Sequence, residues 1–505
     1  MSKGIYTILD SYSGEHEKFL TAMNLLRERL RTIENNNKKS GFTETRPQYT
    51  DILATHNFST ITTFRPHVTV GYEYFKKSKE GGTGSVNLYI NGNTSVRFNL
   101  QGNEGHWIND MVIRVVFQDI GVKNVNIDNP PALRYRYCDL PGMRLFEKVS
   151  LNMDEINIAE YTSDDVAFYD FHVSASKKYG YLRSMGREDT NKGEFYLSDQ
   201  QVKQVLEYRN GAQTYKYYQP KLELWIPLLF WFNKDVRQSL RNMVIKTSQR
   251  NIDINLAPLN KIIRAIDAND NIVSDAITVF KIESMDLYTK NIYVNSEIND
   301  LFVNRNLITP IRIQKRHEQI LESEEGEIHL NQLKYAIEYL KFGFKPVENE
   351  LDFDHWYQYS KIIIEEIPHI TVINNPIVNP VQQIVIRTIK FAKCENSVDH
   401  VGFKAFGNIL YPKLAPEFYN QHISLINPDI VTPDDCGKMI APFNLLPGAR
   451  EISGHFNNSR SREFYLTYDA KEKIDSNNKV KLFVSAEVIA FIYYDTFSIN
   501  LKYIT

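Results

Sequence analysis

Most of the apolar periodicity in this chain has a period of two, which is the spacing of a β-strand with one buried and one wet face. The C-terminal segment is the clearest case, since its apolar positions are Phe497, Ile499, Leu501 and Tyr503. Other apolar blocks are short and rich in Val, Ile, Tyr and Phe, as strands on half-buried sheets prefer. The pattern predicts an all-β protein built from sandwiches or jelly rolls, with polar connections at the strand ends.

The segment from Tyr217 to Asn233 reads YYQPKLELWIPLLFWFN. Pro227 removes one hydrogen bond of a strand ladder, so this strand is expected at a sheet edge or at a bulge. The apolar side chains around Pro227 are expected to be buried, with both faces of the strand covered. Their burial contributes about 10 kcal/mol before conformational entropy is counted. They are Leu224, Ile226, Leu228, Phe230 and Phe232.

Three segments carry helical spacing instead. Residues 15–33 have a continuous apolar stripe, and residues 198–208 begin with a capping box. The third segment is an amphipathic stretch that contains Leu330, Leu333, Ile337 and Leu340. We therefore expect one N-terminal helix and a few short helices in loops.

The length of 505 residues suggests two or three domains, or two large all-β ones. The apolar pattern becomes irregular at residues 265–271, and a new strand-like block begins at Leu287. Each half is large enough for one elaborated eight-stranded jelly roll. The expected divisions are an N-terminal helical segment 1–45, a first sandwich 46–257, a linker 258–284 and a second sandwich 285–505.

Charge and cysteine content narrow the class of protein. With 59 basic and 61 acidic side chains the net charge is −2, which disfavours direct binding to nucleic acid. The cysteines Cys138, Cys394 and Cys436 are too few for a disulfide framework or a four-ligand zinc site, and they fit a reducing, intracellular folding site. The longest strongly apolar run, residues 224–232, is half a membrane span, and no stretch has signal-peptide character, so neither a membrane span nor conventional secretion is expected.

Two local features resemble ligand sites only superficially. Residues 81–84 are Gly-rich but lack the Lys-Ser/Thr pair of a phosphate-binding loop. Asp352, Asp354 and His355 carry metal-ligand atoms but lack a third region to complete a coordination sphere. They are expected in a solvated turn above Trp356.

Two further features are equally weak. Glu322, Glu324, Glu325 and Glu327 lack the alternating ligands and fixed Gly of a calcium loop and are expected in an exposed loop. Cys436 follows two aspartates, which raise a thiol pKa and make a poor nucleophile. We therefore predict no catalytic, cofactor-binding or metal-binding residues, no bound cofactor and no enzymatic activity.

Seven further motifs run in order along the chain. They are FRPHVTVGYEY (64–74), GHWINDMV (105–112), YCDLPGMRLFEKV (137–149), EYTSDD (160–165), NIYVNSEINDLFVNR (291–305), TPDDCG (432–437) and SGHFNNSRSREFYLTYDA (453–470). Together with the segment 217–233, these motifs resemble the major capsid proteins of nucleo-cytoplasmic large DNA viruses, in the version found in African swine fever virus and its asfarvirus-like relatives.

The resemblance implies a double jelly roll, which is two eight-stranded antiparallel sandwiches standing side by side. It also implies a homotrimer that forms a pseudo-hexagonal capsomer and tiles an icosahedral shell. The implied locations are the virion capsid and, during assembly, the viral factory in the host cytoplasm. The implied partners are the chain itself, neighbouring capsomers, minor capsid and penton proteins, and the internal viral membrane at the capsomer base, without direct contact to nucleic acid.

Two local consequences are left open. The N-terminal helix is expected either to contact other components at the capsomer base or to cover the bottom of its own first sandwich. In the last motif, Arg460, Arg462 and Glu463 lie beside aromatic residues, and an arginine against a sheet face needs a partner. Asp434 or Asp435 is the expected partner, within one chain or across a subunit contact.

Two other functions fit parts of the pattern. Jelly rolls also occur in carbohydrate-binding and carbohydrate-active proteins, whose exposed aromatic residues stack on sugars. A signal peptide or paired cysteines would have favoured that class, and neither is seen. A transient scaffold of the poxvirus type is also a double jelly roll trimer, but the quoted motifs fit the retained capsid type better.

Overall fold

The structure is a computed structural model. It describes residues 71–80, 84–90, 92, 94–100, 105–123, 131–153, 156–187, 215–234, 238–242, 249–293, 307–373, 383–449, 451–459, 463–494 and 499–504. Within these residues no helix is both long enough and apolar enough to cross a membrane.

In the described part of the chain, the first half forms a sandwich of a six-stranded and a four-stranded antiparallel sheet. The larger sheet has the order β1 (Gly71–Ser78), β14 (Val279–Tyr293), β4 (Trp107–Phe117) and β10 (Leu222–Pro227), with β2 (Val86–Tyr89) on β14 and β11 (Leu240–Arg241) on β4. The smaller sheet has the order β3 (Thr94–Asn99), β12 (Arg250–Leu256), β7 (Phe146–Met153) and β8 (Ile156–Thr162).

The second half repeats this arrangement. Its larger sheet has the order β15 (Leu307–Leu321), β25 (Val480–Tyr494), β17 (Ala336–Pro346) and β22 (Lys438–Pro442), with β23 (Phe456–Asn457) on β17 and β26 (Ile499–Tyr503) on β25. Its smaller sheet has the order β16 (Glu325–His329), β24 (Phe464–Asp469), β20 (His400–Ala405) and β21 (Asn408–Leu414).

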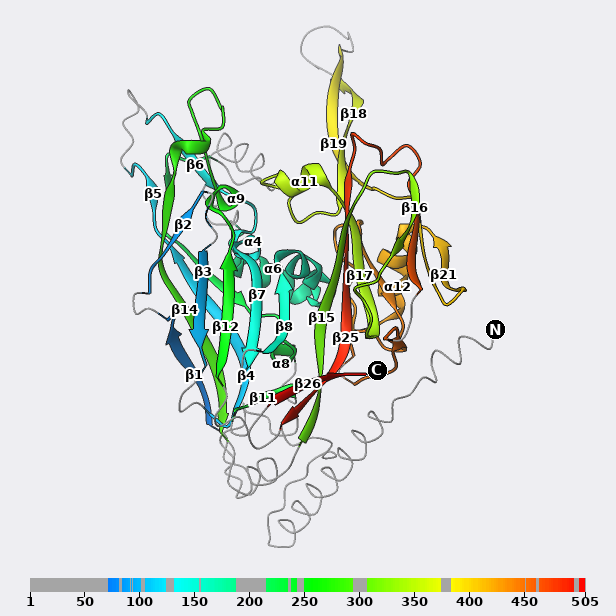
Figure 1. The fold of residues 1–505 in the computed structure, drawn as a ribbon. Coiled ribbons are helices and arrows are strands. Elements are labelled where there is room, and N and C mark those ends of the chain that lie inside the picture. Colours follow the sequence, from blue (N-terminus) through cyan, green and yellow to red (C-terminus); the bar gives the residue numbers. More distant parts are fainter. Residues whose placement is uncertain are drawn as a thin grey trace, which may run out of the picture.

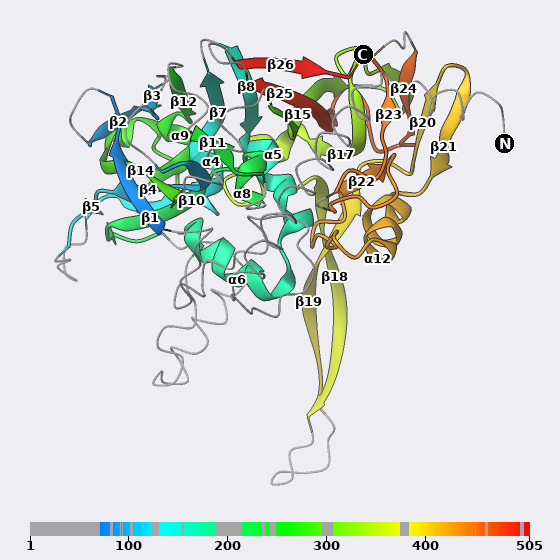
Figure 2. The same ribbon diagram turned by 90° about the horizontal axis from the view of Figure 1, so that it is seen from below.

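Each half is a jelly roll with the same path. Eight strands of each half lie on the two main sheet paths, apart from the two strands that pair at the side of the larger sheet. Counted along the chain, the eight have the order first, eighth, third, sixth in one sheet and second, seventh, fourth, fifth in the other. Figure 1 shows the two sandwiches side by side, and the view from below in Figure 2 agrees. The predicted double jelly roll is confirmed.

Strand β4 shows why the alternating sequence folds this way. Its inward side chains, Met111, Ile113, Val115 and Phe117, are fully buried between the two sheets. The residues between them are only half-buried. Burial of one face therefore sets the register of the strand, because a slip by one residue would turn the apolar set outward.

The boundary between the halves differs from the expected linker at residues 258–284. That segment contains α9 (Leu259–Ile262), β13 (Ile263–Ile266) and the start of β14. Strand β13 forms a separate two-stranded sheet with β6 (Arg134–Tyr137) of the first half, and β14 pairs with β1 and β4 of the first sandwich. The irregular polar stretch is a turn in which the Asp267 carboxylate accepts hydrogen bonds from backbone N–H groups. We therefore place the boundary after Tyr293.

The apolar segment 217–233 forms the edge strand β10 and the helical turn α8 (Trp231–Lys234). All five of its expected core residues are buried, at most 3% exposed, and Pro227 ends the strand at the sheet edge. Only one face is covered in the single chain, because Glu223 and Trp225 on the other face are exposed.

The expected helices have mixed outcomes. Residues 1–45 and 198–208 lie outside the described residues. The predicted amphipathic helix at 330–340 is wrong, because this segment leads into strand β17. Every residue of β17 is buried, since one face packs on its own sandwich and the other on the first sandwich. A strand buried on both faces has no period of two, and its apolar spacing then imitates a helix.

The remaining helices are short and lie in connections, as expected. They include α4 (Pro141–Leu145), α5 (Ser163–Ala167), the 3-10 helix η1 (Phe168–His172), α6 (Ala175–Ser184), α11 (Val347–Leu351), the π-helix η6 (Phe418–His422) and α12 (Ile423–Ile426). A long hairpin, β18 (Ser360–Ile373) with β19 (Gln383–Asn396), connects β17 to β20 and extends away from both sandwiches (Figures 1 and 2). The C-terminal strand is confirmed as β26, where Leu501 and Tyr503 are half-buried and Lys502 is exposed.

Candidate functional site at the seam between the sandwiches

The connection that follows β8 leaves the first sandwich and packs on the second. It consists of α5 and η1, and it lies against the outward face of the sheet formed by β15, β25 and β17. Thr162 begins α5, and its backbone N–H donates to the Asp165 carboxylate at 3.0 Å. This cap directs Asp164 and Asp165, two residues of the EYTSDD motif, toward the second sandwich. We call this contact region the seam.

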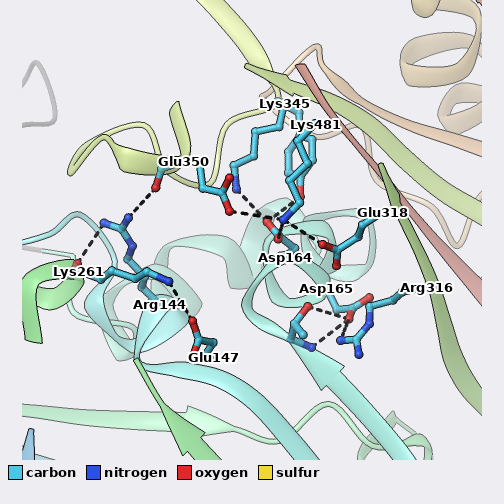
Figure 3. A network of polar contacts seen from close by, with 12 residues as sticks. Arg144, Glu147, Asp164, Asp165, Lys261, Arg316, Glu318, Lys345, Glu350 and Lys481 are labelled. Atoms are coloured by element: carbon cyan, nitrogen blue, oxygen red, sulfur yellow. Dashed lines mark hydrogen bonds and ion pairs between the residues drawn. The ribbon is translucent and has the colours of Figure 1, made fainter. Parts of the chain in front are cut away.

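Asp164 is the centre of the first charged cluster in the seam (Figure 3). Its carboxylate accepts hydrogen bonds from Lys345 Nζ at 2.9 Å and from the Tyr359 hydroxyl at 2.8 Å. Lys481 Nζ lies 3.7 Å away and also pairs with Glu318 and Glu350. Burial opposes the charge of Asp164, but the two lysines outweigh it and lower the pKa of this carboxyl to about 2.

Asp165 is fully buried in a second cluster. It accepts a hydrogen bond from Ser485 Oγ at 2.6 Å, and Arg316 Nη1 lies 3.5 Å away. Arg316 also donates to Glu160 at 2.9 Å. Burial raises the pKa of Asp165 above its usual value, because Arg316 and Lys341 compensate only partly. The two neighbouring carboxyls therefore shift in opposite directions.

Aromatic and apolar side chains fill the seam between the charges. The Phe168 ring lies 4.6 Å from the Tyr359 ring and 5.4 Å from the Phe483 ring, measured between centroids. Residues 229–231, which follow β10, line a small cavity together with residues 312–314 of β15. The seam is thus continuous from the connection after β8 to the connection after β10.

A third part of the seam is built around α4. Arg144 donates to the backbone carbonyl oxygens of Lys261, Glu350 and Asp352 at 2.9 to 3.2 Å. Trp356 Nε1 donates to the Asp139 carbonyl oxygen at 2.8 Å. These bonds attach the YCDLPGMRLFEKV motif to the connection that follows β17.

The predicted turn at Asp352 belongs to this part of the seam. His355 pairs with Asp352 at 2.7 Å, while Asp354 pairs with Arg136 of the first sandwich at 2.8 Å. Trp356 is buried beneath, as expected. These acidic side chains therefore face protein partners, and among the described residues no group of three or more His, Cys, Asp or Glu could hold a metal ion.

The other candidates from the sequence are also accounted for. Gly84 lies in a bend, and residues 81–83 are outside the described residues. Glu325 and Glu327 lie on the exposed face of strand β16, so this acidic run is only partly the expected loop. Burial and then Asp435 raise the pKa of the Cys436 thiol to about 11, and burial raises that of Cys138 to about 12.

Asp434 and Asp435 have other partners in the described residues than the expected arginines. Asp434 pairs with Lys178 of α6 at 2.6 Å. Asp435 accepts hydrogen bonds from the backbone N–H groups of Tyr359 and Gly437 at 2.6 and 3.0 Å. Arg460 and Arg462 lie outside the described residues, so their pairing stays a prediction.

Sequence reasoning missed the basic side chains of the seam. Lys341 and Lys345 lie in the strand AIEYLKFGFKP and are at most 3% exposed. Two lysines and Glu338 inside a largely apolar strand are a signal for buried charge partners. The charged side chains described in the seam contact one another and backbone carbonyl oxygens. What the seam can do is hold two sandwiches in one fixed orientation.

Comparisons with known proteins agree with the motifs. No family model matches the chain. The chain is 24% identical to the hexon protein p72 of African swine fever virus (isolate Tick/Malawi/Lil 20-1), with 100% of both chains aligned, and equally similar to the major capsid protein of the isolate Pig/Kenya/KEN-50.

Solved structures show the same fold. The major capsid protein of Faustovirus superposes with a TM-score of 0.68 at 23% identity, over 94% of this chain and 98% of that one. The VP54 protein of the virus PBCV-1 gives a TM-score of 0.60 at 16% identity, over 88% of this chain and 99% of that one. The resemblance to these capsid proteins, first stated on the motifs, is confirmed.

Proposed function

We propose that this chain is a major capsid protein of a large DNA virus, whose work is to build the wall of the particle. The single observation that carries the proposal is the pair of jelly rolls with identical strand order, fixed side by side by a buried seam. The full-length similarity to viral hexon and major capsid proteins supports it. It also favours this function over a carbohydrate-binding or carbohydrate-active one.

Three copies of such a chain supply six similar wall elements. A closed ring of three chains then has a nearly hexagonal outline, and hexagons tile the flat facets of a shell without gaps. The seam serves this geometry because each ring alternates contacts within a chain and contacts between chains. A flexible seam would let the outline vary, so a fixed orientation of the two sandwiches is a requirement of the function.

Buried ion pairs suit this requirement better than they suit simple stability. Apolar side chains of similar volume often stabilise a fold as well as a buried ion pair does. Ion pairs, however, are satisfied in one relative orientation only. Asp164 with Lys345 and Asp165 with Arg316 are such pairs, and each links the first sandwich to the second in one orientation.

The proposal extends to location and partners. The protein forms the virion capsid, assembles in the viral factory of the host cytoplasm and contacts minor capsid and penton proteins. The N-terminal segment 1–45 contacts inner components, including the internal membrane, at the capsomer base. Deletion of residues 1–40 then leaves trimers intact but impairs shell assembly, whereas loss of folding would place this segment in the core.

The chain is proposed to have no enzymatic activity and to bind no cofactor. Support comes from the similarity to structural proteins and from the partners that the described acidic residues already have.

Light scattering tests the proposal directly. The purified full-length protein is expected to have about three times the chain mass of 58.8 kDa, and negative-stain images are expected to show a hexagonal outline. A stable monomer or dimer at micromolar concentration would contradict the proposal.

A further inference from the structure

An exposed apolar patch lies on the second sandwich. Leu425 and Ile426 of α12 are 81% and 57% exposed, and Leu445 and Leu446, after β22, are 83% and 50% exposed. The two segments are neighbours, since a Cβ atom at Gly448 would lie 3.0 Å from the Asp429 carbonyl oxygen. Four exposed large aliphatic side chains on two neighbouring segments indicate a surface that another molecule covers.

The patch occupies the same place in the fold as the seam segments of the first sandwich. The connection after β21 holds η6 and α12, just as the connection after β8 holds α5 and η1. Pairing with β17 stops at Pro442 and resumes at Phe456, just as pairing with β4 stops at Pro227 and resumes at Leu240.

The backbone hydrogen bonds at the point where pairing stops are the same in both sandwiches. Strand β10 ends at Pro227 opposite Val112, and β22 ends at Pro442 opposite Tyr339. The next residue donates its backbone N–H to the strand in each case: Leu228 to the Met111 oxygen at 3.0 Å and Phe443 to the Glu338 oxygen at 2.8 Å. In this alignment Leu446 corresponds to Trp231.

The corresponding segments have opposite exposure. In the first sandwich Leu229, Phe230 and Trp231 are at most 9% exposed, because the second sandwich covers them. In the second sandwich Leu445 and Leu446 have no third sandwich to cover them. We therefore expect Leu445 and Leu446 to be covered by a surface like the sheet face of the second sandwich that covers residues 229–231.

The first sandwich carries such a surface. The same alignment places Arg114 of β4 where Lys341 of β17 stands, and Tyr288 of β14 where Glu487 of β25 stands. Lys341 and Glu487 are about 1% exposed inside the seam, whereas Arg114 and Tyr288 are only half-buried. Beside them Trp225 is 39% exposed, with its ring 5.3 Å from the Tyr288 ring.

We propose that the apolar patch of one chain docks on the outward face of β14, β4 and β10 in a second copy of this chain. This proposal rests on the proposed function, and it names the contact between neighbouring chains in the ring of three. The patch and the receiving face are different surfaces of the chain, so the contact is head-to-tail, which gives a ring where the rotation closes, and not a two-fold dimer. Arg114, Trp225 and Tyr288 give the receiving face the residue types that are enriched at protein interfaces.

The first experiment disrupts the patch. The double variant L445D/L446D places two charges on exposed positions, so the fold of the single chain is expected to be unchanged by circular dichroism. Light scattering across a dilution series is expected to show monomers, with at least a roughly hundredfold rise in the concentration needed for half association. The matched control is Ile409→Asp, since Ile409 is 66% exposed on β21 but lies on the other sheet of the same sandwich.

The outcomes are separable. If the wild-type chain and both variants form trimers, the patch is not the contact and this inference falls while the proposed function stands. If the wild-type chain is a monomer, the proposed function falls and the inference with it. If I409D dissociates as readily as L445D/L446D, a general effect of added charge explains the result and the inference is overturned.

The second experiment tests the receiving face without relying on disruption. Trp231 and Glu487 line the same small cavity in the seam, so their counterparts Leu446 and Tyr288 are expected to meet between chains. The variant L446C/Y288C, in a C394S background that removes the exposed native thiol, is treated with a short bismaleimide. Covalent dimers and trimers are expected on a denaturing gel. Only monomers, as for either single cysteine variant, would overturn the assignment of the face.

Discussion

Lys345 of the second sandwich donates to Asp164 of the first at 2.9 Å, across a separation of 181 residues in the chain. The lysine side chain is 4% exposed and the aspartate side chain 14%. This largely buried ion pair links the two jelly rolls across the seam. Its charged groups are therefore tied to one relative orientation of the sandwiches.

Removal of the lysine is expected to destabilise the chain. Lys345→Met keeps most of the side-chain volume but leaves Asp164 with the more distant Lys481 and the Tyr359 hydroxyl. Breaking a buried pair on one side costs about 3 kcal/mol, because the remaining charge stays buried. Urea unfolding at one fixed protein concentration measures the loss.

The control for this variant is Lys404→Met. Lys404 pairs with Glu327, whose side chain is 53% exposed, and an exposed pair contributes little. Equal shifts of the urea midpoint in K345M and K404M would show that the seam pair has no special role.

Most of the fold followed from local pattern. The alternation at residues 499–503 and the apolar run around Pro227 predicted strands that the structure contains. The local pattern failed where a strand is buried on both faces. Glu338 and Lys341 of β17 are at most 1% exposed, although charged side chains are normally expected on the surface, so neither their polarity nor the apolar spacing predicted a buried strand here.

The seam could not be predicted for a different reason. The motifs EYTSDD and YCDLPGMRLFEKV were visible in the sequence, and they do carry Asp164 and Arg144. Their partners in the second sandwich, however, are far away along the chain: Lys345 is 181 residues from Asp164, and Glu350 is 206 residues from Arg144. Nothing in the sequence around Asp164 indicates Lys345. Long-range pairing comes from the relative placement of two sandwiches, which no local period encodes.

Gly437, the last residue of the TPDDCG motif, lies so close to the backbone of Tyr359 that no side chain fits there. A Cβ atom at this position would lie 2.3 Å from the Tyr359 carbonyl carbon and 2.4 Å from its oxygen. Since both neighbours are backbone atoms that cannot rotate away, Gly437→Ala is expected to destabilise the chain by about 3 kcal/mol or more. Thermal unfolding measures the effect.

The matched substitution is Gly180→Ala in α6, where no atom lies within 4 Å of the added methyl group. It removes a flexible residue from a helix and is expected to stabilise by about 0.5 to 1 kcal/mol. Similar melting temperatures for G437A and the wild type would show that the backbone at Tyr359 relaxes freely.

The pKa of Asp164 makes the seam sensitive to acid. This carboxyl titrates near 3.8 in the unfolded chain and has a pKa of about 2 in the folded one, because Lys345 and Lys481 outweigh its burial. A lowered folded pKa means that the unfolded chain binds protons first as the pH falls. The stabilisation is therefore complete above pH 4 and is lost as the pH approaches 2, by about 2 kcal/mol in total.

Asp165 works in the opposite sense. Burial raises its folded pKa, so its ionisation destabilises the folded chain as the pH rises through that value, despite Arg316. The acid loss from Asp164 is therefore isolated by a difference between variants rather than by the wild-type curve alone.

The variant Asp164→Asn is expected to show a weaker loss of stability between pH 4 and pH 2 than the wild type, measured by urea midpoints at each pH. Asp434→Asn serves as the control, because the Asp434 side chain is 85% exposed and its variant is expected to follow the wild-type curve. If D164N and the wild type lose stability in parallel over this range, the lysines do not hold the Asp164 charge. The seam would then depend on packing around Phe168 rather than on ion pairs.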